Sequence, residues 1–472
     1  MSHRATLLGR GYEDSHLDSP RLRFRRALVL SVMTIVVPGS AQLAVGRKAV
    51  GAFALTIWLA ALGAGGYLLW RARTDRAGVI DVLTDPDNLL YLRVALIVVV
   101  ALWVLLFVDA WRLAHPRRLN WVRGVALTVV NLAVIGTVAG SAAYASQVLG
   151  VSREVVKTVF AATETSEPLH GRYNILLIGS DSGPDRIGIR PDSLTVASID
   201  TETGRTVLVS IPRNLQAVPF PEDSPMHQVY PYGFSCGSAC LINAVHTYAA
   251  NRTDLYPDAD DPGLEATIDA VEGATGLKIN YYFMVNLKGF RALIDSVGGV
   301  EIDVKTRIAM FGHEDSWKNV WIEPGLQKLN GRKALWYARS RVQSDDYTRM
   351  GRQKCLLAAM LDQLTPTTVV TNAVDIGKSS KELLSGNMPQ TELGQFAELA
   401  LKARGEKIVT VSLVPPQVNP VNPDYDAIHQ LVQAGIDKSE RADVATPTPT
   451  ATPEEDKSQR SANNADDLDA VC

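Results

Sequence analysis

Arginines and carboxylates gather in residues 335–353 at spacings that suit the binding of a phosphate anion. Arg339 and Arg341 are two residues apart and share a face if this part is a strand. Asp346 precedes Arg349 by three residues, so the two side chains are neighbours if a helix begins near Asp346. Guanidinium groups stay charged at every working pH and pair with phosphate oxygens through two hydrogen bonds. A set of surface ion pairs is the alternative. Arg352 and Gln353 are further candidates in the same segment.

Two aspartates beside predicted strands are candidate ligands of a divalent cation. Asp181 follows one apolar run directly, and Asp192 precedes another. Carboxylate oxygens suit hard cations, and the ends of strands in open α/β sheets often carry ligand sites. Turn capping is the alternative role for both aspartates. Together with Arg190 and Arg213, which also flank predicted strands, they form a set suited to a pyrophosphate bound through Mg²⁺ (or Mn²⁺).

The elements that position these residues alternate along residues 168–438. Short β-rich runs and helical segments follow one another, which predicts an α/β domain with helices packed on a central sheet. The chain has no Walker-type glycine loop, so a nucleotide is not the expected ligand. The predicted strands are Tyr173–Ile178, Ser193–Ile199, Thr206–Ile211 and Val300–Val304, and the predicted helices are Gly263–Glu272, Leu287–Val297 and Arg349–Leu364.

The first third of the chain predicts an α-helical membrane region at 27–146, behind a basic N-terminus at 1–26. Three of its four apolar stretches are long enough to cross a bilayer. The first contains Pro38 and Gly39 and has basic flanks, so we expect a re-entrant or interfacial segment there. The four stretches are 27–45, 49–70, 90–113 and 124–146.

Charge indicates the orientation of this region. The arginines before residue 27 and those in the loop 112–123 are expected to stay in the cytoplasm. Three crossings then place the large domain outside the cell. Four crossings, the alternative, would return that domain to the cytoplasm. A linker is predicted at 147–167.

Composition excludes two classes of protein and predicts the character of the C-terminal end. The net charge of -3 gives no basic field for nucleic acid. Four cysteines are too few for a disulfide-built scaffold. Residues 439–472 form a Thr/Pro-rich, acidic tail that is predicted to be disordered.

The order of these motifs over 168–438 resembles the LytR-CpsA-Psr family. The chain differs from the common family pattern at Asn214, Leu241, Asn286 and Lys354. The motifs are Asn174-Ile-Leu-Leu-Ile-Gly-Ser-Asp181, Arg190-Pro-Asp192-Ser-Leu, Ser210-Ile-Pro-Arg213, Leu241-Ile-Asn243-Ala, Phe290 to Gly298-Gly299-Val300, Tyr337-Ala-Arg339-Ser-Arg341, and Asp346 to Arg349 and Arg352-Gln353.

The resemblance implies an α/β fold with a hydrophobic tunnel for a polyprenyl chain. It also implies a magnesium-dependent phosphotransferase in the plasma membrane of a bacterium, with its catalytic domain outside. The implied donor is a polyprenyl-pyrophosphate-linked glycan, and the implied acceptor is peptidoglycan or a glycoprotein. By the same resemblance Asp181 and Asp192 are metal ligands. Pyrophosphate would be bound by Arg190, Arg213, Arg339 and Arg341, with Asp346, Arg349 and Gln353 lining the same pocket.

Three questions stay open at this point. The same site could hydrolyse the lipid carrier, or the domain could be a non-catalytic membrane sensor of lipid-linked precursors.

An external domain permits disulfides. A Cys240–Cys355 bridge is preferred because both cysteines flank pocket motifs, Cys236–Cys240 is the rival, and Cys472 is expected to be unpaired.

Overall fold

The computed structural model describes residues 20–114, 119–159, 165–181, 190–310, 321–342, 344–363, 384–404, 406–441 and 472. The chain divides into two compact units, residues 1–153 and 154–472. Most of the predicted disordered tail and most of the basic N-terminus lie outside the described residues.

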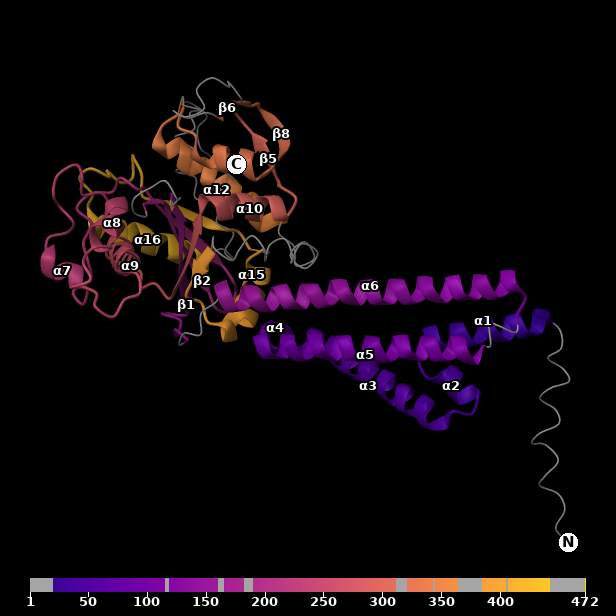
Figure 1. Cartoon of the computed structure of the whole chain (residues 1–472). Helices are drawn as coiled ribbons and strands as arrows, with labels where there is room; N and C mark the ends of the chain where they lie inside the picture. The colour runs from indigo at the N-terminus through magenta and orange to yellow at the C-terminus, as the bar shows by residue number, and fades with distance from the viewer. Residues whose placement is uncertain are drawn as a thin grey trace, which may run out of the picture. The chain divides into compact units, whose positions relative to one another are not determined.

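Every secondary-structure element described in the first unit is a helix (Figure 1). Three of its helices, α3, α5 and α6, are long and apolar enough to cross a membrane. The first apolar stretch is instead broken between α1 and α2, where Gly39 adopts a φ of 91°, in the region that favours glycine. The helices are α1 (Pro20–Val36), α2 (Ser40–Ala44), α3 (Lys48–Thr74), α4 (Arg76–Thr84), α5 (Pro86–Leu113) and α6 (Trp121–Val159).

Helices α5 and α6 run antiparallel and keep one register along their length. Near one end, Trp111 Nε1 donates to Thr128 Oγ1 at 3.0 Å. Eighteen residues back along α5 and eighteen forward along α6, Arg93 Nε donates to Ser146 Oγ at 3.1 Å. Helix α6 also continues to Val159, well into the segment predicted as a linker.

The second unit is built on a mixed six-stranded sheet, which confirms the predicted α/β class. Its strand order is β10-β3-β2-β1-β4-β9. Strand β1 is parallel to β4, and β3 is parallel to β10, whereas the other pairs are antiparallel. The strands are β1 (Arg172–Ser180), β2 (Pro191–Asp200), β3 (Thr206–Ile211), β4 (Tyr281–Asn286), β9 (Leu384–Gly386) and β10 (Val409–Ser412).

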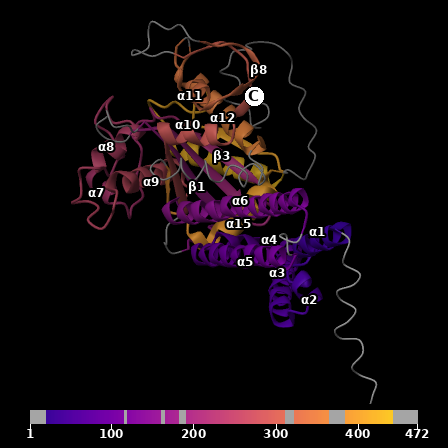
Figure 2. The same ribbon diagram turned by 45° about the vertical axis from the view of Figure 1, so that its right-hand side comes forward.

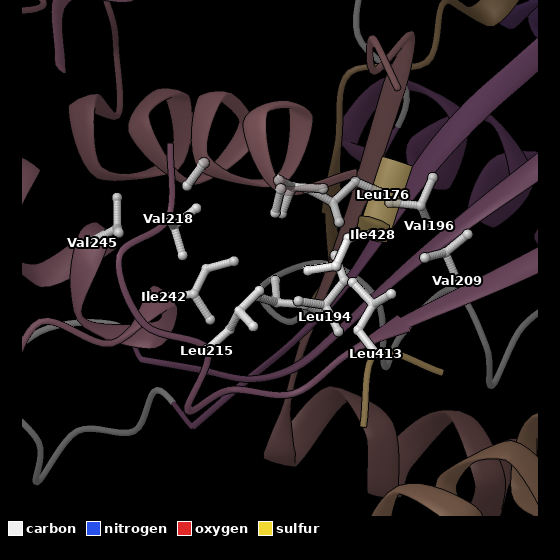
Figure 3. Close-up of a cluster of buried hydrophobic side chains, with 14 of the residues drawn as sticks. Leu176, Leu194, Val196, Val209, Leu215, Val218, Ile242, Val245, Leu413 and Ile428 are labelled. Atoms are coloured by element: carbon white, nitrogen blue, oxygen red, sulfur yellow. The ribbon is translucent and has the colours of Figure 1, made fainter. Parts of the chain in front are cut away.

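One face of this sheet packs on α9 (Pro262–Thr275) and α16 (Tyr425–Glu440) to form the largest apolar core. Alternate residues of the central strands point into it, as the two-residue period of a strand requires. Figure 3 shows Leu176, Val196 and Val209 from three neighbouring strands beside Ile428 of α16.

The opposite face carries α10 (Leu287–Ser296), α11 (Gly331–Arg339), α12 (Asp346–Gln363) and α15 (Leu393–Ala403). Figure 2 shows α10, α11 and α12 grouped together. The same three helices also pack on a two-stranded sheet of residues 300–304 and 325–329. Together these elements form a second apolar core. The remaining elements are β5 (Val300–Val304), β6 (Ile308–Ala309), β7 (Trp321–Ile322), β8 (Gly325–Leu329), α7 (Pro225–Val229), α8 (Val245–Ala249) and two short 3-10 turns, Ile242–Ala244 and Gln390–Glu392.

The sequence allows a strand at residues 335–341 that would put Arg339 and Arg341 on one face. This prediction is wrong, because Gly331–Arg339 is helix α11. Asn330 begins this helix by accepting a hydrogen bond from Lys333 N at 2.9 Å through its side-chain oxygen. Its buried residues then follow a helical spacing of three and four. They are Ala334, Tyr337 and Ala338.

The cysteine pairing also differs from the preferred prediction. Cys236 is bonded to Cys240, the rival pairing, and Cys355 is bonded to Cys472, which was expected to be unpaired. The Cys240–Cys355 bond does not form because the two cysteines belong to different apolar cores. Cys240 is buried in the core under α9, whereas Cys355 lies on α12 and packs against the second core.

Candidate functional site

A cavity of about 350 Å³ lies between the sheet and helices α10, α11 and α12. Most of its wall is apolar and comes from both the strands and the helices. Its polar residues include Asp181 and Asp192, which lie at one end of the β1–β2 pair. Apolar lining residues include Leu177, Leu208, Phe283, Leu293, Leu357 and Met360.

The antiparallel pairing of β1 and β2 brings the two predicted metal ligands to the same end of the sheet. Asp181 N donates to Arg190 O at 3.2 Å, directly after the last strand pair. The Asp181 carboxylate accepts a hydrogen bond from Arg339 Nη2 at 3.1 Å. The Asp192 carboxylate accepts one from Arg213 Nη1 at 2.8 Å. Each predicted metal ligand therefore contacts a predicted pyrophosphate-binding arginine.

Asp346 is surrounded by three arginines. Its carboxylate lies 3.1 Å from Arg349 Nη2, 3.4 Å from Arg213 Nε and 3.9 Å from Arg341 Nη1. One carboxylate cannot neutralise three guanidinium groups, even with Asp192 contacting one of them. The cluster therefore retains positive charge beside the cavity and favours an anion there.

Arg349 is the most deeply buried member of this cluster. Its side chain is 4% exposed, and burial lowers the pKa of its guanidinium, although Asp346 opposes the shift. Nη2 also donates to the backbone oxygen of Asp192 at 3.2 Å. Its Nε is buried and has no hydrogen-bond partner among the described residues. A buried donor without a partner costs free energy, so this atom favours an added acceptor such as a phosphate oxygen.

Four of the predicted arginines do not line the cavity, and Arg213 is one of them, although it contacts the lining residue Asp192. Arg190 is exposed, and so is Arg341, whose side chain is 53% exposed and only approaches Asp346. Arg352 is buried, but it donates to Ser340 O and to Ser344 Oγ, and its role is to support the turn before α12. Burial lowers the pKa of Arg352 to about 10. The cavity does include Arg339, Arg349 and Gln353.

Lys354 and Asn286 line the cavity although neither was a candidate. Lys354 follows Gln353 on α12, so a helical wheel turns it about 100° away from that residue. Its Nζ donates to Ser412 Oγ of β10. Burial lowers the pKa of the Lys354 amine to about 8. In the sequence, Lys354 was marked only as a difference from the common family pattern, because its contact with the sheet is a long-range contact.

The lowered pKa predicts how stability depends on pH. Between about pH 8 and the ordinary lysine value, the unfolded chain binds a proton that the folded chain has released, so stability rises with pH. Lys354→Met removes this effect. We expect the wild type to gain about 2–3 kcal/mol relative to the variant between pH 7.5 and 10.5. Urea unfolding at both pH values measures the difference, and parallel pH profiles would contradict it.

The site fits a magnesium ion that shares its coordination with a phosphate. Mg²⁺ usually binds through one or two carboxylates plus substrate oxygens and water. Asp181 and Asp192 both line the cavity. No group of three or more His, Cys, Asp or Glu side chains with metal-binding geometry occurs among the described residues. Two carboxylates therefore suit a metal ion that binds together with a phosphate anion. They do not suit a closed structural site, in which the protein supplies every ligand.

Comparison with known proteins identifies the relatives of this chain. Residues 152–439 match the LytR_cpsA_psr family. The polyisoprenyl-teichoic acid–peptidoglycan teichoic acid transferase TagV of Bacillus subtilis is 27% identical over 226 residues, covering 48% of this chain and 51% of TagV. The cell wall biosynthesis protein LcpA of Corynebacterium glutamicum is 25% identical over 332 residues, covering 64% of this chain and 61% of LcpA. The chain thus spans about half to three fifths of these relatives.

Solved structures of similar proteins include TagV of Bacillus subtilis. It has 24% sequence identity and a TM-score of 0.41, and the match covers 56% of this chain and 96% of that chain. TagT bound to LIIa-WTA has 18% identity and a TM-score of 0.39, with 60% of this chain and 94% of that chain covered.

Proposed function

Since the chain belongs to the LytR_cpsA_psr family, we propose that it is a membrane-anchored phosphotransferase. It attaches a glycopolymer from a polyprenyl-pyrophosphate carrier to peptidoglycan or to a cell-surface protein. The relatives support this reaction class, because TagV is a transferase of teichoic acid to peptidoglycan and LcpA is a cell wall biosynthesis protein. Helices α3, α5 and α6 form the anchor, and the charge bias of their loops favours an extracytoplasmic second unit.

The arginine cluster around Asp346 is the observation that carries this proposal. Three guanidinium groups lie within 3.9 Å of the Asp346 carboxylate, and one of them, that of Arg349, also lines an otherwise largely apolar cavity. A ligand that satisfies both parts has an anionic head and an apolar tail. A polyprenyl pyrophosphate has both. The cavity volume of about 350 Å³ is at the low end for ligand pockets, so it holds only a part of the polyprenyl chain.

The reaction follows from this placement. A hydroxyl of the acceptor attacks the phosphorus on the sugar side of the pyrophosphate, and a new P–O bond forms. The bridging P–O bond breaks, and polyprenyl phosphate leaves with the bonding electron pair. The hydroxyl proton passes to a base or to solvent. Arg213, Arg339 and Arg349 hold the phosphate oxygens and stabilise the charge that develops on the leaving group.

We further propose that Asp181 and Asp192 bind Mg²⁺ together with the pyrophosphate. The ion supplies neutralisation of phosphate charge when it is bound. Arg339 and Arg213 orient these two carboxylates through the hydrogen bonds at 3.1 and 2.8 Å. The arginines therefore have two tasks, since they both bind the anion and position the carboxylates.

Removal of the metal is expected to abolish transfer. Chelation with EDTA should reduce product formation to background, and added Mg²⁺ should restore it. Asp181→Asn keeps the shape of the side chain but removes its charge, so we expect the Mg²⁺ concentration for half-maximal rate to rise at least tenfold. A magnesium titration of both proteins measures this change. Full activity in EDTA would contradict the proposed metal site.

The proposed reaction is tested with the full-length protein in lipid nanodiscs. The assay contains a labelled polyprenyl-pyrophosphate sugar, Mg²⁺ and peptidoglycan fragments, and it measures polyprenyl monophosphate and labelled acceptor. Equal amounts of both products support the transferase. Polyprenyl monophosphate with free glycan phosphate would instead show hydrolysis. Tight lipid binding with neither product would indicate a sensor.

A further inference from the structure

We propose that the seam between α5 and α6 binds the phosphate headgroup of a membrane lipid through Arg93 and Arg153. This site lies in the first unit and is separate from the cavity of the second unit. The inference rests on the proposed membrane crossing of α5 and α6. The identity of its lipid rests on the proposed function.

The Arg93 side chain crosses the seam, and its guanidinium occupies space that is free because residue 150 is glycine. Its Nε donates to the buried Ser146 Oγ at 3.1 Å. Its Nη1 and Cζ lie 2.8 and 3.1 Å from the point where a Cβ on Gly150 would be. Any larger residue at position 150 would displace the guanidinium, so the glycine allows the group to lie flat against α6.

Arg153 reaches across the same seam in the opposite direction. Its Nε donates to Pro86 O at 2.9 Å. Arg153 lies three residues after Gly150, and positions three apart share a helix face about 4.5 Å apart along the axis. The Arg93 guanidinium therefore lies beside a residue that shares the helix face of Arg153, and the partners of the two arginines, Ser146 Oγ and Pro86 O, are neutral.

The charge of this pair is not compensated within the described part of the unit. Neither Arg93 nor Arg153 forms an ion pair there, although Asp85 and Asp87 lie at the same end of α5. The opposite end of α5 shows the contrast. Asp109 lies 2.5 Å from Arg47 and also accepts a hydrogen bond from Gln42 at 3.3 Å, so its charge is balanced.

Depth in the membrane makes the missing anion costly. Arg93 is seven residues from the start of α5, about 10 Å along the helix, within the apolar stretch 90–113. A charge without a partner costs up to about 2.5–3.5 kcal/mol on insertion scales when it lies at the centre of a membrane helix, and less toward the boundary. A lipid phosphate at the boundary of the hydrocarbon core supplies the anion where it is needed. Two guanidinium forks also match phosphate oxygens in geometry.

The surroundings of Arg93 suit a lipid better than a free anion. Leu90, Val94 and Ile97 are large apolar side chains exposed on the same helix. They provide a surface for an acyl or isoprenyl chain attached to the bound phosphate. In the proposed reaction, both the donor and the leaving group are lipids of this kind. A second site would keep polyprenyl phosphate at the protein, a task that a single anchoring helix cannot perform.

Lipid retention by the full-length protein tests the site. Nanodiscs are made from phosphatidylcholine with equal small amounts of phosphatidylglycerol and polyprenyl monophosphate. The protein is then extracted in mild detergent, and bound lipids are counted by native mass spectrometry. All samples carry Arg213→Ala, which removes one arginine of the cluster around Asp346 in the second unit, so any lipid retained there contributes equally to every sample. No sugar donor or acceptor is present, so failure of the transferase proposal would leave the result unchanged.

We expect wild-type seam residues to enrich the two anionic lipids over phosphatidylcholine, whose headgroup phosphate is already balanced by choline. Arg93→Gln with Arg153→Gln should reduce this enrichment about twentyfold, from about fivefold for each basic residue at a membrane surface. Arg73→Gln is the matched control, since Arg73 is an exposed arginine in the last turn of α3. Gly150→Leu keeps both charges, yet it should also reduce enrichment because it fills the space under Arg93.

The outcomes separate the sources of the phosphate. Preference for polyprenyl monophosphate supports a site for the reaction's own lipid, and equal retention supports a general phospholipid site. Equal retention by wild type and the double variant would overturn the proposal. So would an equal loss in Arg73→Gln, because it would show a nonspecific charge effect. Matched melting temperatures confirm that the variants are folded.

Discussion

Arg213→Ala is expected to lower the rate of glycopolymer transfer about a thousandfold, the upper range for loss of one charge-stabilising donor. Arg213 contacts both Asp192, at 2.8 Å, and Asp346, at 3.4 Å. Its removal therefore takes away a phosphate contact and also the residue that orients a proposed metal ligand. The measurement is the initial rate of labelled acceptor formation at saturating Mg²⁺.

Two further variants show whether this loss is specific. Arg213→Lys keeps the charge but not the planar fork, so an intermediate rate is expected. Arg252→Ala removes an arginine that pairs with Asp254 on the surface, and it should leave the rate unchanged. The Arg213 side chain is only 23% exposed and contacts two carboxylates, so thermal melting of the variant is measured alongside the rate. A rate within twofold of wild type would exclude Arg213 from the reaction.

Leu357→Trp is expected to reduce transfer from a long-chain donor about a hundredfold. Leu357 lines the cavity and packs against the sheet at Ala197 and Leu208. The larger ring occupies space that the polyprenyl chain needs, and each methylene kept out of an apolar site costs about 0.8 kcal/mol. The rates are compared for donors with a full-length chain and with two isoprene units. Only the long chain needs the blocked space, so the short donor should keep its rate.

Leu361→Trp provides the matched control. It lies one turn later on α12, is 41% exposed and is not among the residues that line this cavity. We expect normal rates with both donors. If Leu357→Trp slowed both donors equally, the effect would be a general distortion of α12 and the tunnel interpretation would be wrong. Thermal melting checks the overpacking cost, about 1–3 kcal/mol for a core insertion.

The sequence predicted the buried strands well because burial leaves a strong local pattern. Thr206–Ile211 and Val300–Val304 match β3 and β5 in both bounds. The expected start of a helix near Asp346 also agrees with α12. Strand β5 alternates buried and exposed residues, whereas β3 is a short apolar run that is buried at every position, and both patterns indicate a strand.

The site was less predictable because its members come together through long-range contacts. The run Leu335–Arg339 contains aromatic residues common in strands, yet the cap at Asn330 and the buried face of α11 make it helical. Arg339 still reaches the site, but from a helix end, where it contacts Asp181. Arg352 has the right type and position in sequence, yet its neighbours on the turn use it structurally. Residue type alone cannot distinguish these two uses of arginine.

The bond between Cys355 and Cys472 gives the C-terminal part of the chain the topology of a closed ring. The two cysteines are 117 residues apart, so every peptide bond between them belongs to that ring. A single proteolytic cut anywhere inside it opens the ring but releases no fragment while the bond is oxidised. Such a protein would run as one species on a non-reducing gel and as two after reduction. In oxidising surroundings, α12 with its Arg349 and Gln353 would stay covalently joined to Cys472 after such a cut.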